Sequence, residues 1–252
     1  QLALPLLDLH AKDAKLFVWL HYSDPHAPYQ LPAGAANPFL NDRLYTGDAR
    51  IDLRSSEVAK GKKLGEHEEL KYYVAQYDAN VRVADQAIGA ALDRARRLGL
   101  LDDALIVFAA DHGESLGEHG LYFEHGPLPY NTTAHVPLLF VDTRRPGTVP
   151  AGRRIDRPVE LVDLYPTLCD LVAPGRRVAG LEGRSLLPFF SAPLEAAAAA
   201  PFERAFSEAG GRWNQAYFVS VQEARWKLVY RRPGRRAATP AVHYELYDLV
   251  AD

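Results

Sequence analysis

The sequence contains one cysteine, Cys169, no methionine and no apolar run long enough to cross a membrane. A single cysteine excludes an intrachain disulfide and any metal site built from several cysteines. The net charge of −3, with arginines scattered along the chain, gives no electrostatic reason to expect a nucleic-acid partner. The P-loop, the Rossmann glycine pattern and the Gly-x-Ser-x-Gly elbow are absent too, which removes the commonest nucleotide-binding and esterase classes.

What is present is the composition of a globular protein. The 252 residues are 48% hydrophobic and 24% charged, enough for one large domain or one and a half. The chain starts at Gln1 rather than at methionine, runs quickly into apolar sequence, and stops at Asp252 without a tail. We therefore expect a piece of a longer protein, so the missing signal peptide or anchor says nothing about location.

Residues 1–195 are predicted to form an α/β core. Three short apolar segments, at 15–22, 104–110 and 136–141, are typical of strands buried on both faces, which usually belong to parallel sheets. Helical spacing of apolar residues predicts a long helix over 66–98 and a short one over 161–172. The expected fold is a mixed, largely parallel sheet between helices, and the polar stretch 30–65 has the length of a binding loop or lid.

The last part of the chain has a different period. Segments 204–208, 216–221, 225–230 and 244–249 are short, aromatic and roughly alternating, and turns separate them. This pattern favours a small antiparallel sheet, so residues 201–252 are predicted to be a second unit.

Polar side chains gather where the three predicted strands of the core end. Five of the nine histidines lie in or beside these loops: His21, His26, His112, His119 and His125. Ligands of such sheets bind beyond the carboxyl ends of the strands, and an Asp-His pair there suits a divalent ion. Histidines nearby could contact an anionic substrate or protonate a leaving group. The structural alternative for Asp111 and His112 is a turn with a capping carboxylate. For His26 it is a loop histidine held by the flanking prolines, and for His125 a hydrogen bond to the loop backbone.

The same residues carry a family resemblance. His-Tyr-Ser-Asp-Pro-His-Ala-Pro-Tyr at 21–29, Asp-His-Gly-Glu at 111–114, Glu-His-Gly at 124–126 and Val-Pro-Leu at 136–138 resemble the sulfatase family of the alkaline-phosphatase superfamily. Asp-Leu-Tyr-Pro-Thr-Leu at 163–168, Gly-Leu-Glu-Gly-Arg-Ser-Leu at 180–186 and Glu-Leu-Tyr-Asp-Leu at 245–249 extend the match. The motifs come in the family's order and cover nearly the whole chain, so the alkaline-phosphatase-like fold is the expected one.

The resemblance implies roles for four residues. Asp111 and His112 match a pair that binds one divalent ion (Ca²⁺, Mn²⁺ or Mg²⁺), although many relatives have Asn at the second position. His26 matches a catalytic histidine that contacts the sulfate or phosphate and assists the leaving oxygen. His125 stands where relatives place a Lys or His that binds the same anion. The implied substrate is a small-molecule or glycan sulfate or phosphate ester.

One family feature is missing. Relatives attack the substrate with a formylglycine made in a Cys/Ser-x-Pro/Ala-x-Arg motif, or with Thr or Ser, beside an acidic metal-binding pair. Neither occurs here, so we expect the N-terminal segment of the same protein to supply them and this chain alone to be inactive. The alternatives are a phosphonate or phosphodiester hydrolase, a phosphoglycerol- or phosphoethanolamine-type transferase, and a non-catalytic module of the same fold. The resemblance favours an extracytoplasmic location.

Overall fold

The computed structural model describes residues 3–13, 15–40, 62–126, 128–176, 178–191, 202–210, 216–232 and 243–251. The chain divides into two compact units, one of residues 1–104 with 114–124 and the other of residues 105–113 with 125–252. The boundary predicted between 195 and 201 lies outside the described residues, as do residues 41–61 of the predicted loop.

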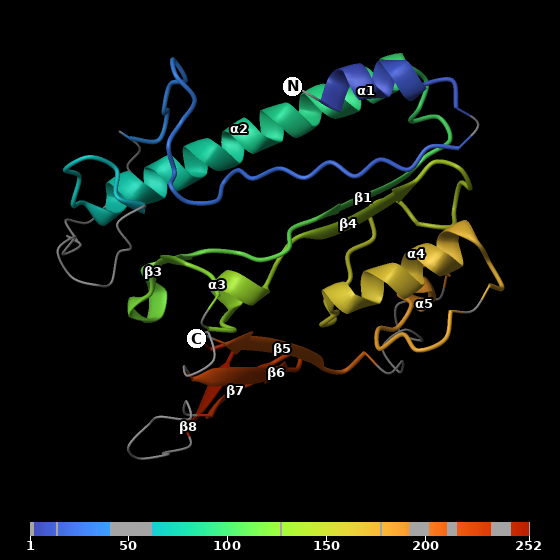
Figure 1. Cartoon of the computed structure of the whole chain (residues 1–252). Helices are drawn as coiled ribbons and strands as arrows, with labels where there is room; N and C mark the ends of the chain where they lie inside the picture. The colour runs from blue at the N-terminus through green and yellow to red at the C-terminus, as the bar shows by residue number, and fades with distance from the viewer. Residues whose placement is uncertain are drawn as a thin grey trace. The chain divides into compact units, whose positions relative to one another are not determined.

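The first unit is built on the long helix α2, Leu70–Arg97, which confirms the helix predicted over 66–98 (Figure 1). Its basic last turn complements the helix dipole, and Gly99, with φ of 73°, ends it by donating its N–H to the carbonyl oxygen of Arg96. Helix α1, Ala3–His10, which the sequence did not predict, is tied to α2 by a bond of 2.6 Å from Arg94 Nε to Asp8 Oδ1.

The segment 15–22 differs from its prediction. It is extended, but it pairs with no strand among the residues that the structure describes. Its apolar side chains are exposed, Phe17 by 82% and Trp19 by 76%. The prediction of a buried strand is therefore wrong for this chain, because nothing described in it covers these side chains.

An aromatic cluster forms the core of the first unit. Tyr73 of α2 stacks on Phe123 at 4.6 Å between ring centroids, and Tyr29 meets Phe123 edge-on at 5.5 Å. Phe123 lies in β3, Tyr122–Glu124, which pairs antiparallel with β2, Ser115–Leu116, across the short helix η2, Glu118–Gly120. The cluster thus fixes the end of the loop that carries His26 against this hairpin.

The second unit contains the strand pair β1, Leu105–Ala109, and β4, Leu138–Asp142. Both predicted strands are confirmed, but they pair antiparallel, with Val107 opposite Phe140. A parallel pair needs a crossover connection, usually a helix, and the described residues between these strands form no helix longer than the single turn α3, Asn131–Ala134. No parallel pair occurs among the described residues, so the parallel sheet is not shown.

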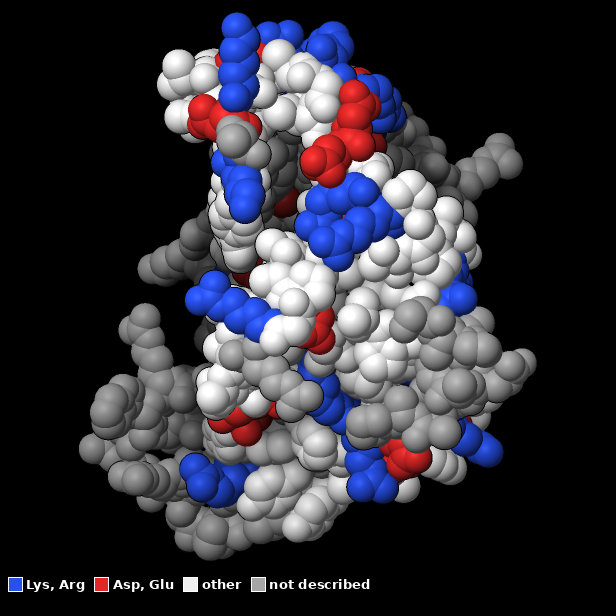
Figure 2. All heavy atoms as spheres, turned by 90° about the vertical axis from the view of Figure 1, so that its right-hand side faces the viewer, with Lys and Arg blue, Asp and Glu red and all other residues white. Residues whose placement is uncertain are grey.

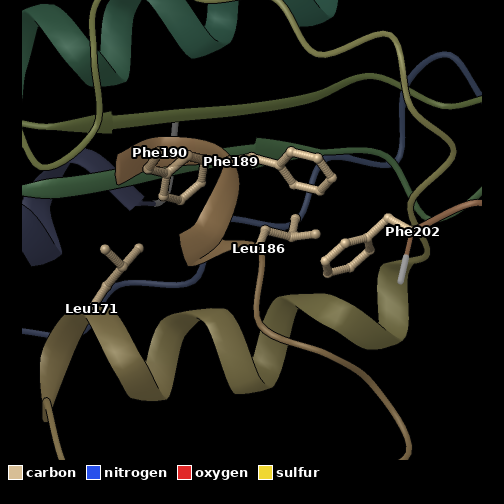
Figure 3. Close-up of a cluster of buried hydrophobic side chains, with 5 residues drawn as sticks. All are labelled: Leu171, Leu186, Phe189, Phe190 and Phe202. Carbon is tan, nitrogen blue, oxygen red and sulfur yellow. The ribbon is translucent and has the colours of Figure 1, made fainter. Parts of the chain in front are cut away.

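A second core lies against this strand pair. Figure 3 shows five buried side chains between the helix α4, Leu164–Val172, and the strands. Leu171 belongs to α4, and Phe189 and Phe190 belong to the short helix α5, Leu187–Ser191. Leu186, just before α5, and Phe202 complete the cluster. Helix α4 and the turn η3 before it, Leu161–Asp163, confirm the helix predicted over 161–172.

Two of the sequence motifs lock this core together. Asp163, fully buried, accepts the backbone N–H of Arg184 at 2.7 Å. The Thr167 hydroxyl accepts the N–H of Leu186 at 2.9 Å. A Cβ at Gly183 would lie 2.1 Å from the carbonyl oxygen of Val162, so only glycine permits this approach. The motifs at 163–168 and 180–186 are therefore structural.

The predicted C-terminal sheet is confirmed as four antiparallel strands in chain order: β5, Ala205–Gly210, β6, Tyr217–Gln222, β7, Trp226–Arg232, and β8, His243–Asp248. One face of this sheet is buried and carries Phe218, Ser220, Lys227 and Val229. The opposite face carries exposed side chains such as Phe206 and Leu246.

No helix in the described part of the chain is both long enough and apolar enough to cross a membrane. On the face seen in Figure 2, positive and negative side chains of the described residues are intermixed rather than gathered by sign.

Candidate metal and anion site

Asp111 and His112 follow the end of β1, where the sequence placed them. Asp111 Oδ1 accepts the backbone N–H of His112 at 3.0 Å, so the carboxylate is turned back toward its neighbour. The Asp111 side chain remains 72% exposed and that of His112 35% exposed. Both groups can therefore reach a ligand from outside the fold.

The His112 ring is oriented by a backbone contact. Its Nδ1 lies 2.8 Å from the carbonyl oxygen of Gly113, so Nδ1 carries the proton that it donates and Nε2 carries the lone pair. Nε2 lies 3.8 Å from Asp111 Oδ2. Two ligand atoms at this separation can share one cation with bonds of about 2.1 Å. A carbonyl that holds the second ring nitrogen is the usual support of a metal-binding histidine.

His125 joins this pair through its ring. The imidazoles of His112 and His125 are stacked, with centroids 3.9 Å apart and an angle of 16° between planes. The two residues come from opposite ends of the loop between β1 and α3. The structure thus brings together three of the four predicted site residues, Asp111, His112 and His125.

His26, the fourth, belongs to the other compact unit. It is exposed, and its ring Nδ1 lies 2.6 Å from the carbonyl oxygen of Ala27. Its backbone N–H donates to the carbonyl oxygen of Ser23.

Tyr29, three residues after His26, is buried; burial, together with the Glu114 carboxylate, raises the pKa of Tyr29. Glu118 accepts the backbone N–H of Leu116 at 2.7 Å, so it organises the loop after β2.

The helical turn α3 packs directly on the end of β1. Gly113 donates its N–H to the carbonyl oxygen of Thr133 at 2.8 Å. A Cβ on Gly113 would lie 2.1 Å from the carbonyl oxygen of Thr132, so a side chain there would push the turn away. The Thr133 hydroxyl donates to the carbonyl of Leu128 at 2.7 Å, which closes the loop between His125 and α3.

Sequence reasoning missed the contacts that fix α3 from the C-terminal sheet. The Tyr130 and Tyr247 hydroxyls both donate to Glu245 Oε2 at 2.6 Å; burial and these bonds raise the pKa of Tyr130. Lys227 Nζ donates to Asn131 Oδ1 at 2.9 Å. The signal available was a lysine among the apolar residues at 226–230, and it could not identify a partner 96 residues away.

These atoms form only part of a coordination sphere. Among the residues that the structure describes, no group of three or more His, Cys, Asp or Glu side chains is arranged to hold a metal ion. Asp111 and His112 supply one hard oxygen and one borderline nitrogen, a donor set that fits Mn²⁺ and tolerates Ca²⁺ or Mg²⁺.

Comparison with known proteins defines the class. The model of the family described as Sulfatase matches residues 1–174, more than half of the chain, and the chain belongs to this family. It is 32% identical over 178 residues to the choline-sulfatase of Rhizobium meliloti, covering 70% of this chain and 31% of that one. To arylsulfatase K of Danio rerio it is 32% identical over 162 residues, covering 64% of this chain and 30% of the relative.

The fold agrees. A phosphonate monoester hydrolase from Silicibacter pomeroyi superposes with a TM-score of 0.60 at 24% identity, over 79% of this chain and 40% of that one. This likeness shows the alkaline-phosphatase-like α/β fold. The chain spans about a third of the length of the curated relatives, 31% and 30%.

Proposed function

We propose that the protein is a metal-dependent hydrolase of sulfate esters. The observation that carries the proposal is the group at the end of β1, where the oriented Asp111–His112 pair has His125 stacked on it. Membership of the sulfatase family supports the reaction class.

Asp111 and His112 would hold the divalent ion, Asp111 through a carboxylate oxygen and His112 through Nε2. Such an ion, when bound, would neutralise charge on the transferred group and favour ionisation of the attacking hydroxyl. Among the three candidate ions we favour Mn²⁺, because Ca²⁺ and Mg²⁺ both prefer oxygen ligands to imidazole.

The two remaining histidines would act on the substrate. We assign to His125 a contact with the sulfate oxygens, because its ring is held beside the metal-binding pair. We assign to His26 the contact with the anion and the protonation of the leaving oxygen, a role that rests on the sequence resemblance. The substrate class is a sulfate ester of a small molecule or a glycan.

The nucleophile is proposed to lie in polypeptide outside these 252 residues. No formylglycine motif occurs in the sequence, and the chain covers about a third of the choline-sulfatase, 31%. The same polypeptide would complete the metal site and the mostly parallel sheet. Exposed apolar side chains on β4, Leu139 by 53% and Val141 by 49%, are what an added layer or strand would cover.

A turnover assay tests the reaction class. The protein expressed from its complete gene is assayed with Mn²⁺ on p-nitrophenyl sulfate, choline sulfate, phenylphosphonate esters and phosphate diesters. We expect turnover of a sulfate ester that Asp111→Ala abolishes. Asp103→Ala, which removes an exposed carboxylate a short distance before β1, is the matched control and should retain activity. Turnover of phosphonates or diesters alone would reassign the substrate, and no turnover at all would identify a non-catalytic module.

A further inference from the structure

Lys227 occupies a position that sheet stability does not explain. It lies on the buried face of the C-terminal sheet, and the residue is only 3% exposed. Among the described residues no carboxylate pairs with its ammonium, whose recorded partner is the neutral amide oxygen of Asn131. Burying a charge against one amide is unfavourable, and burial lowers the pKa of Lys227 to about 8. A methionine of similar volume would stabilise this face better.

The partner of Lys227 is the first residue of α3. A helix of one turn has no stability of its own, so contacts from outside must hold it. Tyr130 before it carries no side-chain cap for the turn and is itself bonded to Glu245 on β8. The C-terminal sheet therefore holds α3 at two adjacent residues. Glu245 of β8 bonds to Tyr130, and Lys227 of β7 bonds to Asn131.

The other side of α3 faces the metal-binding strand end. Gly113, which follows His112 directly, donates to the carbonyl of Thr133 and lets the carbonyl of Thr132 approach without a Cβ between them. The carbonyl of Gly113 in turn receives the proton of His112 Nδ1. A continuous series of contacts thus runs from Lys227 through α3 and Gly113 to the ring of His112.

We propose that Lys227 is a positioning residue of the site: by holding Asn131 it keeps α3 against Gly113 and so keeps Asp111 and His112 in a geometry that binds metal. This inference rests on the proposed function. It makes the C-terminal sheet part of the site, although none of the strands of that sheet supplies a residue to the proposed ligand set.

The test uses the protein expressed from its complete gene and the variant Lys227→Met, which keeps volume and removes the amine. The matched control is Leu228→Ala, on the same strand but on the opposite face of the sheet, where Leu228 lies between Val221 and Leu246; it destabilises the sheet away from α3. Two quantities are measured well below the melting temperature: affinity for Mn²⁺ by calorimetry, and hydrogen exchange of the Gly113 amide by NMR.

We expect Lys227→Met to weaken Mn²⁺ binding roughly tenfold, the usual effect of losing a supporting contact around a metal. Exchange at Gly113 should accelerate by a similar factor. Leu228→Ala should change neither, even where its melting temperature falls further. Asn131→Leu should reproduce the effect, and the double variant should lose no more than either single one, since both remove the same contact.

Unchanged affinity and unchanged exchange in Lys227→Met would overturn the proposal, as would equal effects of Leu228→Ala. Failure of the wild-type protein to bind Mn²⁺ is a different result and overturns the proposed function. In that case exchange at Gly113 still decides whether Lys227 positions the turn: faster exchange supports it, and unchanged exchange refutes it.

Discussion

His112 and His125 lie face to face, with ring centroids 3.9 Å apart and planes inclined by only 16°. Their backbones are separated by the loop that contains β2, η2 and β3. The contact makes His125 a neighbour of the proposed metal ligands and fixes the plane of its ring. It can therefore serve two purposes, ring packing and contact with an anion, and these can be separated.

Replacement of His125 by phenylalanine separates the two purposes. Phe keeps an aromatic ring to stack on His112 and removes the nitrogens that would contact the sulfate. His125→Phe should retain Mn²⁺ affinity and lower kcat by about 100-fold, as loss of a hydrogen-bond donor to the charge of the transition state does. His125→Ala, which also removes the stack, should weaken both. Equal kcat in wild type and His125→Phe, measured with a sulfate ester, would show that the imidazole does not act on substrate.

Gly113→Ala should damage the site through backbone packing alone. The new methyl group would lie 2.1 Å from the carbonyl oxygen of Thr132, and moving α3 away should lower the free energy of unfolding by about 2 kcal/mol. Mn²⁺ affinity should fall as well. Gly126→Ala is the control, because nothing lies within 4 Å of its Cβ. Urea unfolding and calorimetry of both variants check this; similar values for the two would contradict the proposed packing.

Asp142, at the end of β4, should be the strongest electrostatic contributor to the second unit. Its side chain is fully buried and accepts two bonds from the Arg144 guanidinium, at 2.9 and 2.8 Å, which hold the pKa of the Asp142 carboxyl below its usual value. Asp142→Asn should lower the free energy of unfolding by about 3 kcal/mol, because Arg144 loses its charge partner. Asp156→Asn breaks an exposed pair with Arg154 and should leave the urea midpoint almost unchanged.

Lys227 should give stability an unusual dependence on alkaline pH. Its pKa is about 8 in the folded protein and 10.5 ordinarily, so between these values the unfolded chain binds the extra proton. The free energy of unfolding should therefore rise from about pH 8 toward pH 10, relative to Lys227→Met. Above pH 10 the raised pKa of Tyr130 acts in the opposite direction, because only the unfolded tyrosine ionises. Urea titrations at pH 7, 8, 9 and 10 measure the difference, and a constant difference would refute the shift.

Sequence reasoning recovered the elements that depend on local patterns. The apolar stripe of α2, the strands β1 and β4 and the four C-terminal strands lie within a few residues of their predicted positions. The parallel arrangement could not be tested by pattern, because buried strands look alike in either orientation. The segment 15–22 was predicted to be buried because it is apolar. An apolar composition indicates that a strand needs a covering layer, but it does not show whether this chain supplies that layer.

The placement of the candidate site residues divides in a similar way. That Asp111 and His112 follow a strand end was predictable, because adjacent residues need no long-range information. The stack of His125 on His112 and the bond from Lys227 to Asn131 depend on which loops meet in space, and no spacing in the sequence encodes that.

A crystal structure of the protein from its complete gene, soaked in manganese, would show whether Asp111 and His112 bind the ion. We expect an anomalous peak within bonding distance of both a carboxylate oxygen of Asp111 and Nε2 of His112, with Nδ1 still bonded to the carbonyl of Gly113. A peak elsewhere, or none at a concentration that supports turnover, with both side chains directed to solvent, would contradict it.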